Sequence, residues 1–185
     1  IAGAIFAGEV ILREFNLHTF TGIVLSSVTA AIISQAVLGN HPAFEIPKNL
    51  ILESPWEILL YVLLGLLCAI AAIGFTRFLY FMEDGFDKFK KIPVPVKAMF
   101  GGLIIGIIGL QFPHIFGVGY STVKGALHGK EELGMGLLAG LVLLKIFSTS
   151  ITIGSGGSGG VFAPSLFIGA MLGGAFGKFF QWFFD

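Results

Sequence analysis

Charge and cysteine are both scarce in this chain of 185 residues, and each scarcity limits what the protein can do. Charged residues make up only 12% of the sequence, and 11 Lys and Arg cancel 11 Asp and Glu. Without net charge or a basic tract interleaved with aromatic residues, nucleic-acid binding is not expected. Cys68 is the single cysteine, so no disulfide can form within the chain. Because Cys68 lies in an apolar run, we expect a small buried hydrophobic residue rather than a reactive thiol.

Groups typical of metal sites and enzyme centres are also missing. The histidines stand in or beside polar segments, have no Cys or His at ligand spacing, and form no H-E-x-x-H pattern. We therefore expect no metal site, no cofactor and no enzymatic activity. The histidines are His18, His41, His114 and His128.

Long apolar runs dominate the sequence. Hydrophobic residues make up 55% of the chain, and its mean hydropathy is +0.92. These values predict an all-α, multi-pass integral membrane protein. A spanning helix needs about 20 residues, so the unequal run lengths predict tilted and broken helices, as in channels and transporters. The runs cover residues 1–12, 20–38, 56–82, 96–109, 134–153 and 161–184.

Proline-rich and charged segments separate these runs. Residues 39–55 contain several prolines, and residues 92–95 include a Pro-Val-Pro turn, so both are predicted loops. Residues 83–91 are predicted to form a charged loop that contains the densest basic cluster of the chain. The positive-inside rule places this loop on the cytoplasmic side. Its basic residues are Lys88, Lys90 and Lys91.

The ends of the chain and its glycine spacing suggest a piece of a packed helical assembly. Ile1 is not preceded by a methionine or a basic leader, and Asp185 directly follows an aromatic cluster. We expect a fragment of a longer polytopic protein, with any transport pathway open on one side. Glycines at every fourth position are expected to let helices approach closely. They are Gly102, Gly106, Gly136, Gly140, Gly169, Gly173 and Gly177.

The most specific feature is the glycine-serine segment 154–160, which runs directly into an apolar stretch. Glycine adopts positive φ and leaves its N–H group unshielded, and Pro164 suits the first turn of a helix. A helix is therefore predicted to begin near Val161. The first-turn N–H groups of a helix lack internal partners and carry the positive end of its dipole, so they favour a small anion.

A flexible linker is the common alternative for such a segment, whereas a phosphate-binding P-loop is excluded because its lysine is absent. Irregular backbone inside a bilayer survives only where it lines a cavity or is buried in protein. This favours an anion site on the amides of Val161 and Phe162 together with Gly160. Ser158 and Gly159 would then line the approach to it.

Two ionisable residues, Lys145 and Glu9, stand inside apolar runs, where a charge is costly. Lys145 could draw anions into a pore, or its side chain could snorkel or pair with a carboxylate. Glu9 could relay a proton, although pairing with Arg13 at i+4 is the favoured interpretation. Hydroxyl groups near residue 154 could bond back to their helix or face an anion. They belong to Ser148, Thr149, Ser150 and Thr152.

Residues 154–177, GSGGSGGVFAPSLFIGAMLGGAFG, resemble the chloride-site motif of the CLC family of chloride channels and chloride/proton antiporters, roughly GG-x-F-x-P-x-L-x-x-G-A-x-x-G. The resemblance implies an inverted-repeat transmembrane fold. Residues 1–38 would end its first repeat, and residues 56–185 would form the first half of the second. It also implies a homodimer in a lipid bilayer, with residues 20–38 facing the partner, and chloride carried without a cofactor. The amides of Val161 and Phe162 would hold the central anion.

The resemblance extends to the proton pathway of the family. Residues 2–10 align with a segment that ends in two consecutive glutamates in antiporters, which places Glu9 on the first and Val10 on the second, proton-coupling position. Val10 cannot bind a proton, so a channel is favoured over a proton-coupled antiporter. A register shift of one residue would put Glu9 on the coupling position. A membrane scaffold whose glycines serve packing alone is the alternative from another class.

Overall fold

The computed structural model describes residues 17–39, 55–128 and 133–184, and these residues form helices and turns without any strand. The chain divides into two units, Ile1–Glu45 and Ile46–Asp185. The first unit contributes the described helix α2, Leu17–Leu38. Large apolar side chains on α2, such as Leu25 and Ile32, are exposed. Such a helix needs lipid or another protein surface around it.

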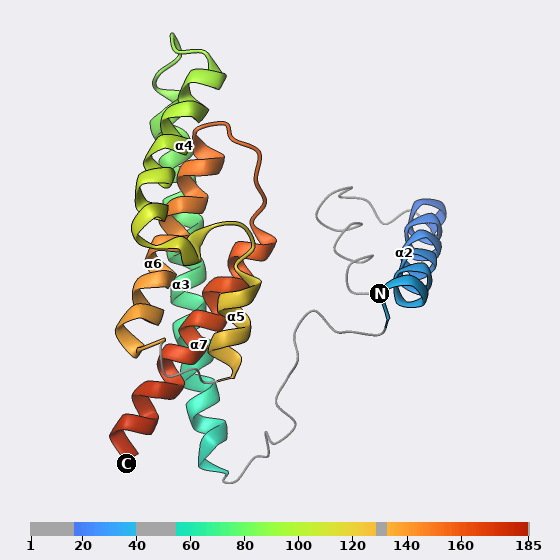
Figure 1. Cartoon of the computed structure of the whole chain (residues 1–185), viewed down its shortest axis with the longest axis vertical. Coiled ribbons are helices and arrows are strands. Elements are labelled where there is room, and N and C mark those ends of the chain that lie inside the picture. Colours follow the sequence, from blue (N-terminus) through green and yellow to red (C-terminus); the bar gives the residue numbers. More distant parts are fainter. Residues whose placement is uncertain (1–16, 40–54, 129–132, 185) are drawn as a thin grey trace. The chain divides into compact units, whose positions relative to one another are not determined.

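The second unit is a bundle of helices (Figure 1), and α6 packs against most of the others. Helix α6 packs against α3, α4 and α7, and the short helix α5 packs against α7. Leu138 and Leu141 of α6 and Phe167 and Met171 of α7 are fully buried, and these two helices pack against each other. The elements are α3 (Trp56–Asp87), α4 (Val94–Gln111), the 3-10 helix η2 (Pro113–Ile115), α5 (Tyr120–Leu127), α6 (Met135–Gly154) and α7 (Phe162–Phe184).

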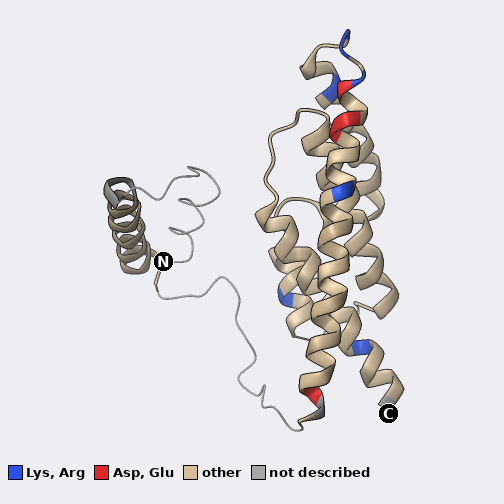
Figure 2. Ribbon diagram, turned by 180° about the vertical axis from the view of Figure 1, so that it is seen from behind, with Lys and Arg blue, Asp and Glu red and all other residues tan. Residues whose placement is uncertain are grey.

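Five of the described helices, α2, α3, α4, α6 and α7, are long and apolar enough to cross a membrane. The predicted all-α fold is thereby confirmed for the described residues. Figure 2 shows how few charged residues interrupt these helices and how blue and red gather around the turn between α3 and α4. Side chains of this kind remain in water or headgroups, outside the hydrocarbon layer.

The boundaries of the charged loop and of the Pro-Val-Pro turn were predicted incorrectly. Helix α3 continues to Asp87, so residues 83–87 are helical rather than part of a loop. A methyl group on Gly154 would lie 3.0 Å from the backbone of Glu83, so α6 packs directly against this part of α3. Helix α4 already begins at Val94. Pro95 therefore lies in its first turn, where the missing N–H costs no hydrogen bond.

The glycines spaced at every fourth residue do not make the predicted close contacts. A methyl group on any of the seven, including Gly169 and Gly173, would meet no other atom within 4 Å among the described residues. Close approaches occur at other glycines instead: Gly101 lies against Ser155, and Gly119 lies against the ring of Phe167. Spacing along one helix does not reveal which face a neighbouring helix covers.

Candidate anion-binding site

The first half of the glycine-serine segment is an ordered cap on α6 rather than a flexible linker. Gly156 has φ 87°. Its N–H donates to the carbonyl of Ile153 at 2.9 Å, and the N–H of Gly157 donates to the carbonyl of Thr152 at 2.9 Å. This pair of bonds is the Schellman motif, which satisfies the last carbonyl groups of a helix and requires a left-handed residue. Glycine supplies that conformation without strain.

The second half leads into α7, which begins at Phe162 as predicted. The carbonyl of Val161 accepts a hydrogen bond from the N–H of Ser165 at 3.0 Å and from its hydroxyl at 2.7 Å. Val161 is therefore the residue that caps the helix, and Pro164 lies within its first turn. The N-terminus of an α-helix directs its first N–H groups and the positive end of its dipole outward from this turn.

A partly open cavity of about 600 Å³ lies at this helix start. It is lined by Gly160 and Phe162 of the predicted anion site and by Ser158, Gly159 and Lys145 of the predicted approach. The structure thus brings five of the six residues predicted for the anion site and its approach to one cavity. Residues 115–118, at the end of η2 and in the link to α5, also line the cavity.

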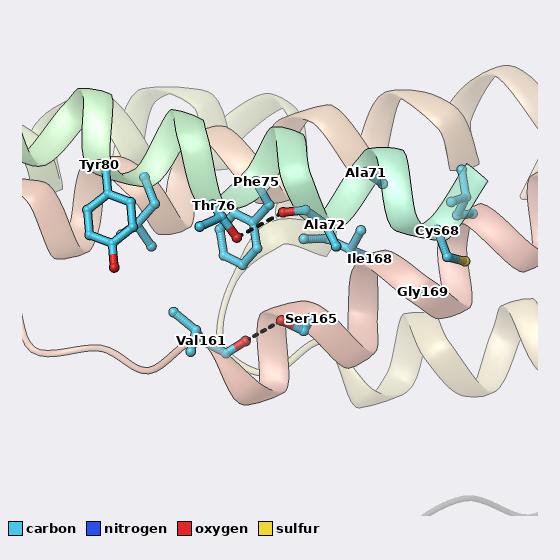
Figure 3. Close-up of a pocket in the computed structure, with 12 residues that line it drawn as sticks. Cys68, Ala71, Ala72, Phe75, Thr76, Tyr80, Val161, Ser165, Ile168 and Gly169 are labelled. Atoms are coloured by element: carbon cyan, nitrogen blue, oxygen red, sulfur yellow. Dashed lines mark hydrogen bonds between the residues drawn. The ribbon is translucent and has the colours of Figure 1, made fainter. Parts of the chain in front are cut away.

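Val161, the sixth residue, lines a separate groove of about 470 Å³ between α3 and α7 (Figure 3). The groove is mainly apolar, and Cys68 lies along it. The hydroxyl of Thr76 donates to the carbonyl of Ala72 at 2.9 Å, and that of Ser165 donates to Val161. Because both hydroxyl hydrogens are used within their own helices, this groove offers little to an anion. Any part of Val161 in an anion site is therefore limited to its backbone.

Lys145 is buried, with only 3% of its surface exposed. Its Nζ donates to the carbonyl oxygens of Ile115 at 2.9 Å and Gly117 at 2.7 Å. The Nζ atom also lies 4.9 Å from the ring centroid of Phe167, within cation–π range. The side chain of Lys145 does not snorkel, and it pairs with no carboxylate among residues 17–39, 55–128 and 133–184. Its ammonium group is held at the cavity wall by backbone oxygens.

The hydroxyl groups of α6 combine the two roles that the sequence left open. Ser148 donates to the carbonyl of Lys145 at 3.2 Å, and Thr152 donates to the carbonyl of Ser148 at 2.8 Å. Both residues nevertheless line the cavity together with Thr149. Ser150 is fully buried, and its hydroxyl has no partner among the described residues.

Two of the predicted site residues cannot be compared with the structure. Glu9 and Val10 lie outside the described residues. Within the described part of the chain, no three His, Cys, Asp or Glu side chains are close enough to hold a metal ion. The sequence analysis did not predict the loop 115–118. The sequence signal for it is the pair of glycines Gly117 and Gly119, which adopt positive φ angles of 58° and 71° in the structure.

Comparisons with known proteins agree with this architecture. The chain matches the sequence model of the voltage gated chloride channel family over residues 1–185. Chloride channel protein CLC-f of Arabidopsis thaliana is 39% identical over 96% of this chain, and CLC-e of the same plant is 37% identical over 97%. Voltage-gated ClC-type chloride channel ClcB of Escherichia coli is 30% identical over 96%. The chain spans 24% of CLC-f, 27% of CLC-e and 42% of ClcB.

Proposed function

Because the chain belongs to the voltage gated chloride channel family, we propose that it forms part of a chloride pathway through the membrane. It is an integral, multi-pass membrane protein. The observation that carries the proposal is the N-terminus of α7, which opens into a cavity that also contains a buried lysine. The positive end of the helix dipole and the positive charge of the lysine both favour an anion there.

In the proposed site, backbone amides at Val161 and Phe162, with Gly160 beside them, replace part of the hydration shell of chloride. Ser158 and Gly159 line its approach. The hydroxyl hydrogens of Ser148 and Thr152 are already donated to carbonyl groups. Amides rather than these hydroxyls therefore supply the hydrogen bonds to the ion. Transport through such a site needs no cofactor and no covalent step.

Channel-like conduction is the favoured mode because Val10, on the aligned coupling position, has no titratable group. A proton-coupled antiporter is the second candidate, since Glu9 is adjacent in sequence and can bind a proton. We also propose that residues 1–38 and 56–185 belong to successive inverted repeats. The exposed apolar side chains of α2 support a homodimer in which this helix faces the partner.

The test uses the full-length protein in liposomes with a chloride gradient. A reversal potential that follows the chloride gradient supports the proposed pathway. A protein that conducts nothing above empty liposomes, yet remains folded and inserted, would instead be a scaffold. In that case the glycines would serve packing alone, and the proposed function would be wrong.

A further inference from the structure

We propose that Lys145 masks two backbone carbonyl oxygens that would otherwise make the cavity wall attractive to cations, and so helps the pathway to exclude cations. The proposal rests on the proposed anion pathway and adds a residue that determines its charge selectivity. The two oxygens belong to Ile115 and Gly117, and both residues line the cavity beside the start of α7.

The loop that connects η2 to α5 cannot satisfy these oxygens by itself. Gly117 and Gly119 adopt φ 58° and 71°, so the chain reverses direction here rather than continuing a helix. No backbone N–H among the described residues donates to the carbonyl of Ile115 or of Gly117. The donor to both is the side-chain ammonium group of Lys145. Ile115 is buried, so its carbonyl oxygen would be costly to leave without a donor, whereas Gly117 is exposed at the cavity and its bond to Lys145 is partly buried.

Lys145 also reverses the sign of the local potential. Bare carbonyl oxygens facing a pore coordinate cations, as in potassium filters, and repel anions. An ammonium group adds a full positive charge where the two oxygens carry only partial negative charges. No Asp or Glu among the described residues forms an ion pair with Lys145. The positive charge is therefore not neutralised by a carboxylate in this part of the chain.

The position of the ammonium group is restrained on a third side by Phe167. This ring is fully buried, lies 4.9 Å from Nζ, and fills the space that a side chain at position 119 would need. Helix α7 therefore holds Lys145 through Phe167, while the same helix presents its N-terminus to the cavity. The lysine, the loop and the proposed anion site form one connected wall.

The experiment compares Lys145→Met with Lys145→Arg in the full-length protein. Methionine keeps much of the apolar stem but has no charge or donor, whereas arginine keeps both. Lys124→Met on α5 is the matched control, because Lys124 is exposed and does not line the cavity. The readouts are the chloride-to-potassium permeability ratio in a KCl gradient and the amide hydrogen exchange of residues 115–120.

We expect Lys145→Met to lower the chloride-to-potassium permeability ratio roughly tenfold or more, because the loss of a unit positive charge at the cavity wall weakens both the attraction for chloride and the repulsion of potassium. Exchange of the loop amides should rise by roughly tenfold or more, because two charge-assisted hydrogen bonds are lost. Lys145→Arg and Lys124→Met should leave the ratio within about twofold of the unmodified protein.

A lower total current with an unchanged ratio would assign Lys145 a purely structural role and overturn the proposal, as would unchanged loop exchange. If Lys145→Met does not accumulate, Lys145→Gln provides N–H donors without charge. It should lower the ratio with less effect on exchange, and an unchanged ratio would again contradict us. If the unmodified protein moves no chloride, the proposed function fails, while the exchange measurement still reports whether Lys145 holds the loop.

Discussion

Single glycines have separate and definable roles in the segment before α7. Gly156 adopts positive φ and lies against Val94. At Gly157, a methyl group would lie 2.7 Å from the carbonyl oxygen of Thr152. At Gly160, a methyl group would meet no atom within 4 Å. The first two glycines are therefore required by the cap of α6, whereas Gly160 keeps the cavity open.

Gly157→Ala is expected to destabilise the protein by about 1–3 kcal/mol, because the added methyl group forces the cap apart and breaks a backbone hydrogen bond. Thermal unfolding in detergent measures the change. Gly160→Ala is the control and should stay within about 0.5 kcal/mol of the unmodified protein, since its added group meets open space. Equal unfolding temperatures for Gly157→Ala and the unmodified protein would contradict the assigned cap.

Gly160→Leu is expected to reduce chloride flux strongly without loss of stability. A Cβ at this position would meet nothing within 4 Å, so the side chain would extend from it into the cavity in front of α7. Flux assays in liposomes at matched protein amounts test this. Gly136→Leu is the control, since Gly136 is equally unobstructed but does not line the cavity. Normal flux through Gly160→Leu would place the pathway elsewhere.

At the scale of elements, α6 organises the second unit. It packs against α3 through Phe78 and Phe147, whose ring centroids are 5.9 Å apart, and against α7, where Leu138 lies beside Gly174. It also carries Lys145, which holds the loop before α5. One helix thus packs against α7 and also holds the loop 115–118 that lines the cavity.

Leu141→Ala is expected to destabilise the bundle by about 2–4 kcal/mol, the range for large-to-small substitutions in a packed core. Leu141 is completely buried, whereas Leu143 on the same helix is 69% exposed. Leu143→Ala is therefore the control and should change stability by about 0.5 kcal/mol or less. Chemical unfolding in mixed micelles compares the two. Equal losses from both variants would show that α6 is not the core helix.

For the whole molecule, the open question is how chloride movement relates to proton movement. We expect the intact protein to carry chloride with little or no proton countertransport, because Val10 cannot bind a proton. Reversal potentials under opposing chloride and pH gradients provide the measurement. A fixed chloride-to-proton stoichiometry would overturn this expectation. Loss of that coupling in Glu9→Gln, with retained coupling in Glu57→Gln on α3, would then assign the proton role to Glu9.

Much of the fold could be read from the sequence because hydrophobic run length and helix punctuation are local properties. The runs predicted α2, α3, α4, α6 and α7, and the glycine-serine segment with Pro164 predicted the start of α7. Positive φ at glycine, the fixed φ of proline and the length needed to cross a bilayer depend on a few neighbouring residues. The family motif and the candidate anion site were available for the same reason.

Only the tertiary structure decided which groups those helices bring together. The partners of Lys145 lie 30 and 28 residues away in the chain, and they are backbone oxygens that no side-chain pattern reveals. The same holds for the glycines: Gly119 meets Phe167, while the regularly spaced Gly169 and Gly173 meet nothing described. Sequence sets the helices because their hydrogen bonds are local. Packing sets the cavity wall because its contacts join segments whose relative placement depends on the whole bundle.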